Sequence, residues 1–240
     1  DVGGYGFADN TTLNSTCSYI STFNGTSAAA PTVAGVIALM LEANPDLTWR
    51  DVKHILALTS DKVDADRTTS LSEISQYSWV ENAAGYEHHN WYGFGKVNSA
   101  AAVNSAKSYT ADSLGSFIDS GYVSNNVAAS IPDLNSITSD ITVTKPSGSN
   151  GIVEFVRVSL KFDHSQAWSV GVRLLSPDNT VINLMQPLTN ISNPGNTLFE
   201  IGASGFYGES MEGNWTIELI DYSSGTTGTF TAWGIQVYGN

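Results

Sequence analysis

The sequence predicts two successive parts of different fold class: a helical first part and an all-β second part. A dense apolar run from residue 32 to residue 41 is typical of a buried helix. Near Tyr109 the helix-forming residues give way to Ser, Gly, Asn and Pro. Beyond residue 150, apolar residues recur at every second position in short segments separated by turn residues, which favours a β-sandwich. We therefore divide the chain into residues 1–108 and residues 109–240.

The first predicted helix follows a loop-like stretch, with a short strand near residues 18–22, and runs from Thr26 to about Ala43. Pro31 falls within its first turn and a half, where losing a backbone donor costs little. Asn44-Pro45 ends the helix, because the residue before a proline disfavours helical geometry. We expect this helix to be buried on most sides. Its surface is covered by apolar and small residues: Val33, Val36, Ile37, Met40, Leu41, Ala30, Ala34 and Ala38.

A second predicted helix begins after Thr48 and runs to about Thr59. Thr48 and Asp51 have the spacing of a capping box, in which each side chain binds the other residue's backbone N–H. The apolar stripe of this helix consists of Val52, Ile55, Leu56 and Leu58. Residues 60 to 91 show no clear period.

Strands of the second part are predicted from residues of one parity, which share a face of a strand. The first segment contains one exception, Glu154, at a position otherwise reserved for apolar side chains. A turn at residues 176–179 follows the second segment. The expected inward-facing residues are Ile152, Val156, Val158, Leu160 and Phe162, then Val170, Val172 and Leu174, then Trp215, Ile217 and Leu219, and last Trp233, Ile235 and Val237.

Ser27 is the candidate nucleophile of the chain. The small-residue turn from Asn24 to Pro31 places it at the start of the first helix, where unpaired backbone N–H groups and the positive end of the helix dipole suit a developing oxyanion. A serine hydroxyl also needs a base and an orienting carboxylate. The 26 residues before Ser27 contain no histidine.

Residues 24–31 resemble the nucleophile segment of the subtilisin-like serine proteases, in the form typical of the kexin and furin branch. Residues 41–52 and 92–103 are similar to two further motifs of that branch, in the same order. The resemblance implies that residues 1–108 are the C-terminal portion of an α/β subtilisin-like catalytic domain. It also implies that the triad Asp and His, and the oxyanion-hole Asn, lie on a segment upstream of this chain.

Residues 109–240 resemble the P domain (also called Homo B) of the proprotein convertases, which implies a jelly-roll sandwich. The matching phrases are residues 131–133, residues 174–178, and residues 213–216 followed by Asp221. One departure is Trp168-Ser169-Val170, where many P domains carry Gly-Asp-Leu.

Cys17 is the only cysteine, so it is either a free thiol or half of a bond to a partner outside the chain. The kexin resemblance implies pairing with an upstream cysteine. It also implies calcium as a structural ion, for which the loop-placed carboxylates include Asp119, Asp133, Asp163 and Asp221. The sequence shows no EF-hand spacing and does not identify metal ligands.

The chain carries 10 Lys and Arg against 23 Asp and Glu, a net charge of −13. This charge argues against nucleic acid or an anionic membrane as a partner. The apolar run of residues 32–41 is too short to span a bilayer. An acidic surface rich in Asn, Ser and Thr is consistent with a secreted protein.

Two functions follow. The first is a secreted serine endopeptidase that hydrolyses peptide bonds through an acyl-enzyme on Ser27. Its partners would be protein or peptide substrates and the N-terminal part of the same protease, as a separate or nicked chain. This chain alone should be inactive. The second is a non-catalytic β-sandwich that binds or stabilises a partner, with an inactive protease remnant. The sequence leaves the cleavage preference open.

Overall fold

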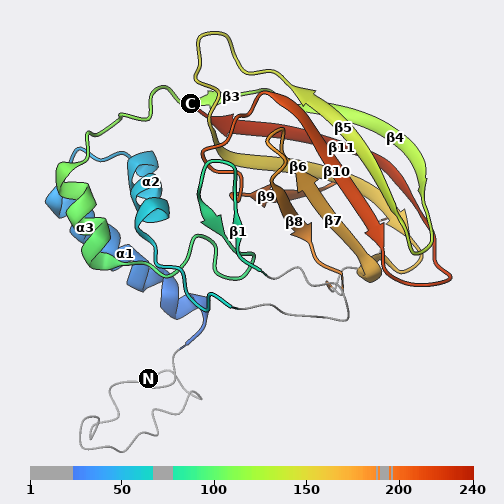
Figure 1. The fold of residues 1–240 in the computed structure, drawn as a ribbon, viewed down its shortest axis with the longest axis horizontal. Coiled ribbons are helices and arrows are strands. Elements are labelled where there is room, and N and C mark those ends of the chain that lie inside the picture. Colours follow the sequence, from blue (N-terminus) through green and yellow to red (C-terminus); the bar gives the residue numbers. More distant parts are fainter. Residues whose placement is uncertain (1–23, 67–77, 188, 190–194, 196) are drawn as a thin grey trace, which may run out of the picture.

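The computed structural model describes residues 24–66, 78–187, 189, 195 and 197–240. In Figure 1 the helices lie together on one side of the molecule and the β-sheets on the other, with β1 between them. The strand expected near residues 18–22 lies outside the described residues. The helical side comprises α1 (Thr26–Ala43), α2 (Trp49–Thr59), β1 (Val80–Glu81), β2 (Glu87–His88) and α3 (Ser99–Ser108).

Helix α1 has the predicted bounds, and Gly25 precedes it with φ 80°, a conformation that glycine adopts without strain. Its burial differs from the prediction. Only Val36 and Met40 are buried, and they pack on the other two helices. The expectation of burial on most sides is therefore wrong for the described chain. The apolar composition of a helix does not specify which elements cover it.

Helix α2 begins with the predicted capping box. The Thr48 side chain accepts the N–H of Asp51, and the Asp51 carboxylate accepts the N–H of Thr48. Val52 and Ile55 are buried as expected, whereas Leu58 is 54% exposed. Leu58 therefore belongs to the predicted apolar stripe in sequence, but its side chain is not buried among the described residues.

The second half of the chain forms two antiparallel sheets. One has the strand order β5-β10-β7-β8. The other has the order β3-β11-β6-β9, with β4 also paired to β11. The strands are β3 (Ile118–Asp119), β4 (Val123–Ile131), β5 (Ser136–Val143), β6 (Val153–His164), β7 (Val170–Leu175), β8 (Val181–Met185), β9 (Phe199–Ala203), β10 (Gly213–Asp221) and β11 (Gly228–Gly239), with a 3-10 turn η1 (Ala167–Ser169).

The core of the second half lies between these two sheets. Trp215 of β10 and Trp233 of β11 belong to opposite sheets, are almost fully buried and share one hydrophobic cluster. The predicted inward-facing residues from 156 to 237 are all buried, while Ile152 is half-buried just before β6. The parity of the sequence therefore predicted the packing of the sandwich.

Helix α1 also bears on the membrane prediction. Among the described residues, α1 is the helix that is long enough and apolar enough to cross a bilayer, judged by length and composition alone. The expectation based on residues 32–41 was too narrow, because the helix that contains them has 18 residues. A core helix of a water-soluble protein passes the same test, so the finding assigns no membrane role.

Candidate active site

Ser27 lies in the exposed first turn of α1. The N–H groups of Ala28 and Ala29 both bind the carbonyl of Gly25, at 3.0 and 3.2 Å, which closes the turn around the serine. Pro31 has no N–H to donate to the Ser27 carbonyl four residues before it. The serine is thus placed at the helix N-terminus, where the dipole and the first N–H groups favour negative charge.

The structure brings no histidine to Ser27 within the described residues. His54 lies on α2 with Nδ1 2.9 Å from the Tyr207 hydroxyl, and His164 is fully buried in the sandwich. His88 and His89 lie at the end of β2 and in the following loop. Burial lowers the pKa of His88 to about 4, so this imidazole is neutral at pH 7. The described chain supplies the candidate nucleophile without a base.

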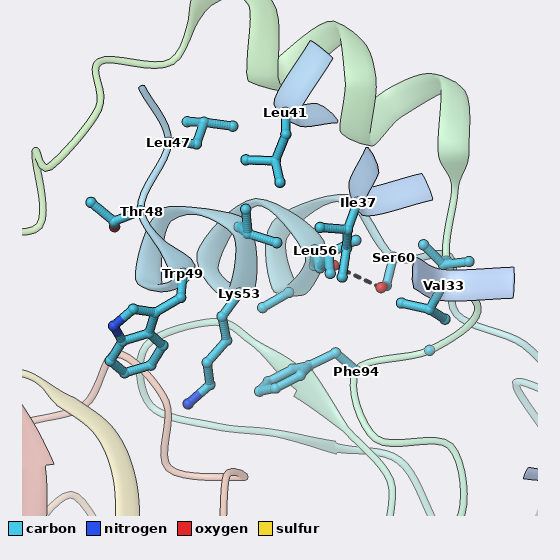
Figure 2. Close-up of a pocket in the computed structure, with 14 residues that line it drawn as sticks. Val33, Ile37, Leu41, Leu47, Thr48, Trp49, Lys53, Leu56, Ser60 and Phe94 are labelled. Carbon is cyan, nitrogen blue, oxygen red and sulfur yellow. Dashed lines mark hydrogen bonds between the residues drawn. The ribbon is translucent and has the colours of Figure 1, made fainter. Parts of the chain in front are cut away.

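An apolar groove of about 710 Å³ lies between α1, α2 and the loop after β2. Figure 2 shows the side chains of Val33, Ile37 and Leu41 from α1 on one side of it and Phe94 on another. Lys53 is the one charged lining residue. The groove is lined by Val33, Ile37, Leu41, Leu47, Thr48, Trp49, Val52, Lys53, Leu56, Ala57, Ser60, Phe94, Gly95 and Val97.

Helix α2 is also joined to the sandwich by a buried ion pair. Arg50 is 6% exposed and Glu154, near the start of β6, is 2% exposed. The Arg50 Nε donates to both Glu154 carboxylate oxygens at 3.1 Å, and its Nη2 donates to one of them. This hydrogen bonding raises the pKa of Arg50, so the guanidinium stays charged. Glu154 is the one polar residue among the inward-facing apolar positions of this strand segment, and its pairing with Arg50 explains why a carboxylate can lie there.

Two more residues of α2 complete this joint. Lys53 Nζ donates to the Glu154 carbonyl at 2.9 Å, and His54 pairs with Tyr207 as described above. Burial lowers the pKa of both Lys53 and His54, and burial raises the pKa of Tyr207. A neutral His54 and a neutral Tyr207 can therefore share one hydrogen bond at pH 7.

The loop between β1 and β2 is held by a second buried acid of the sandwich. Glu209 accepts the N–H of Ala83 at 3.0 Å and the hydroxyl of Thr180. Asn82, which is 3% exposed, donates to the carbonyls of Gly205 and Tyr207 at 3.0 and 2.8 Å. The helical side and the sandwich therefore meet through buried polar groups that are largely paired, with Glu209 Oε2 left without a partner among the described residues.

Of the carboxylates considered for calcium, Asp133, Asp163 and Asp221 lie around the connection between β10 and β11, whereas Asp119 lies on β3. Asp119 accepts from Gln236 and Gly121, Asp133 accepts from Gly225, and Asp221 accepts from side chains around it. Asp163 is exposed at the end of β6. Across the described ranges, no group of three or more His, Cys, Asp or Glu could hold a metal ion. A structural calcium ion stays a prediction, because Ca²⁺ is also bound by backbone carbonyl, amide and water oxygens.

Sequence reasoning predicted Ser27 but missed the joint. Glu154 carried a signal, because it interrupts an apolar parity. Arg50, Tyr207 and Glu209 carried none, since their partners are distant in the sequence. His164 lies at the end of β6, where its Nδ1 accepts the N–H of Gln166 at 3.2 Å. Cys17 lies outside the described residues.

Comparison with known proteins gives a consistent result along the chain. It is 34% identical over 229 residues to human proprotein convertase subtilisin/kexin type 6, covering 90% of this chain and 22% of that protein. It is 30% identical to an extracellular serine protease of Aeromonas sobria, covering 90% of this chain and 38% of that protein. A crystal structure of the Aeromonas sobria serine protease has the same fold over 95% of this chain and 46% of its own, with a TM-score of 0.84 at 24% identity.

The chain thus spans between about a fifth and a half of the relatives named above. Two family models match it, in the order that the sequence motifs predict. Residues 4–95 match the subtilase family and residues 153–237 match the proprotein convertase P-domain. The chain therefore belongs to the subtilase family through its first part and carries a proprotein convertase P domain in its second.

Proposed function

We propose that this chain is part of a secreted, kexin-like serine endopeptidase in which Ser27 is the nucleophile. The observation that carries the proposal is the place of Ser27 in the exposed first turn of α1, within the segment that matches the subtilase family. An exposed hydroxyl at a helix N-terminus can reach a substrate carbonyl and lies beside backbone N–H donors. Secretion is supported by the Aeromonas relative, which is named as extracellular.

In the proposed reaction, Ser27 Oγ attacks the scissile carbonyl and loses its proton to a histidine base. The Ser27 N–H donates to the oxyanion that forms on the carbonyl oxygen. Collapse of the tetrahedral intermediate breaks the C–N bond, and the histidine returns the proton to the leaving amine. Water then hydrolyses the acyl-enzyme by the same route in reverse. The histidine and its orienting aspartate belong, in this proposal, to the N-terminal part of the protease.

The same proposal assigns an occupant to the groove beside α1. We place the C-terminal portion of the catalytic domain in residues 1–108 and the P domain in residues 109–240. Strands of the N-terminal part, on a separate or nicked chain or in one chain, would cover Val33, Ile37 and Leu41. The apolar character of that face supports this assignment, because monomeric proteins rarely leave such patches open. The P domain stabilises the catalytic part through α2.

The test is labelling of the native protein with a fluorophosphonate, followed by denaturing intact-mass analysis and peptide mapping. We expect one label per active molecule, on Ser27, and none in a Ser27→Ala variant. Ser99→Ala is the matched control, because Ser99 is likewise an exposed serine in the first turn of a helix. A labelled Ser27→Ala variant, or an unlabelled wild-type protein that cleaves peptides, would contradict the assignment.

A further inference from the structure

Asn44, the residue that caps the C-terminus of α1, ties that helix to the rest of the molecule. Its backbone N–H binds the Met40 carbonyl and completes the last turn. Its side-chain Nδ2 donates to the carbonyls of Ala106 and Tyr109, at 2.9 and 3.0 Å. Ala106 lies in the last turn of α3, where its carbonyl also accepts the Tyr109 N–H, and Tyr109 is the residue that follows the helix. One side chain thus joins the ends of two helices.

The chain leaving α3 is then fixed to α2 and, through it, to the sandwich. The N–H of Asp112 donates to the Asp51 carboxylate at 3.0 Å. The carbonyl of Gly115 accepts from Arg50 Nη1 at 2.5 Å, and Arg50 is the residue paired with Glu154. These hydrogen bonds, together with the backbone of residues 109–115 between them, therefore connect the end of α1 to β6.

Ser27 and Asn44 lie at opposite ends of α1. Val36 and Met40, the buried residues of α1, lie in its second half, and Asn44 closes it. The first turn, with Ser27, is exposed. Ser27 lies 17 residues before Asn44, so about 26 Å of helix separates the two residues. A tilt of about 2° at the base moves the serine by about 1 Å, a displacement that can cost about 100-fold in rate.

We propose that Asn44 is a positioning residue for Ser27: by tying the end of α1 to the end of α3, it sets the direction of the helix axis. This inference rests on the proposed role of Ser27 as nucleophile. It assigns no chemistry to Asn44, which acts through the helix. Asn44→Asp is the sharpest variant, because it keeps the size of the side chain and replaces the donating NH₂ with an oxygen that faces two carbonyls.

The first measurement is hydrogen exchange of the full-length protein, read by mass spectrometry. Asn44→Asp should speed exchange in peptides that cover residues 36–44 and 99–109, while peptides from β10 and β11 stay unchanged. Asn125→Asp is the matched control, since Asn125 also donates through Nδ2 to two oxygens, on exposed β4 of the sandwich. Unchanged exchange at both helix ends would overturn the anchoring, whatever Ser27 does.

The second measurement is the rate and end point of fluorophosphonate labelling. The end point counts folded sites, and the rate reports how well each site is arranged. We expect Asn44→Asp and Asn44→Ala to keep the end point and to label about 10- to 100-fold more slowly. If an Asn44 variant has a lower end point but the wild-type labelling rate, Asn44 has a merely structural role and the proposal is overturned. The proposal is also overturned if wild-type Ser27 is labelled and the Asn44 variants are labelled at the same rate. Absence of label on wild-type Ser27 would instead refute the proposed function and, with it, this role of Asn44.

Discussion

Replacing Glu154 by alanine would leave the Arg50 guanidinium buried without its anion. The two side chains are 3% and 6% exposed, and Arg50 makes its hydrogen bonds to Glu154 through both Nε and Nη2. Removing one partner of a buried pair costs about 3–5 kcal/mol, because an uncompensated charge remains in the interior. Arg50 keeps its bond to the Gly115 carbonyl. We therefore expect a loss near the lower bound, about 3 kcal/mol.

The measurement is urea unfolding of the native protein, with the midpoint and the slope fitted separately. A loss of about 3 kcal/mol at an unchanged slope lowers the midpoint by about 1–3 M for the slopes usual in urea. Glu200→Ala provides the control. Glu200 pairs with Arg157 of the same strand β6, but these side chains are 48% and 42% exposed. Such a pair contributes about 0–1 kcal/mol.

The reasoning would be refuted if Glu154→Ala and Glu200→Ala cost the same within about 0.5 kcal/mol. A double variant sharpens the test. In Arg50→Met with Glu154→Leu, no charge is left buried, and such replacements of buried pairs are often neutral or stabilising. The double variant should therefore be more stable than Glu154→Ala. If it is less stable, the cost comes from lost packing rather than from the stranded charge.

Three further predictions concern other parts of the chain. Burial lowers the pKa of His88 from 6.5 to about 4, so the native state binds a proton there less readily than the unfolded chain does. The neutral, buried His88 therefore leaves stability unaffected above pH 6.5. Between pH 6.5 and pH 4 the free energy of unfolding falls by up to about 1.4 kcal/mol per pH unit. His88→Gln should flatten this acid limb in unfolding experiments at stepped pH, and an unchanged limb would contradict the assignment. Asp221→Ala should cost about 2–4 kcal/mol, because Ser169, Ser223 and Thr226 lose their buried acceptor; Asp163→Ala, at an exposed site, should change stability by less than about 0.5 kcal/mol. Cys17 should form a disulfide with a cysteine outside this chain, visible as a mass or mobility change on reduction; a thiol that alkylates without reduction would disprove the pairing.

The sandwich could be predicted well because its information is local. A strand buried on one face repeats every two residues, and Val158, Leu174 and Ile217 all fall where that repeat places them. The ends of the helices were equally readable, since Thr48 and Asp51 satisfy each other within one turn. The prediction for Leu58 was wrong because the spacing of apolar residues in the sequence does not show which side of the helix packs against its neighbour.

The joint between the two parts could not be predicted, because its members are brought together only by the fold. Arg50 and Glu154 are separated by 104 residues, and Asn82 and Tyr207 by 125. The sequence marked Glu154 as unusual without naming its partner. The candidate site was predicted only as far as Ser27, whose turn is local, while the base that would activate it has no counterpart among the described residues.

Strand β11 imposes an order on how the second half can fold during synthesis. It pairs with β3, β4 and β6, and so lies at the centre of a sheet whose other strands precede it by up to about a hundred residues. The strand to which β3, β4 and β6 all pair is complete only when residue 239 has been synthesised. Pairings across such distances form slowly. A ribosome that stalled before β11 would leave several sheet edges unpaired, ready to pair with other chains.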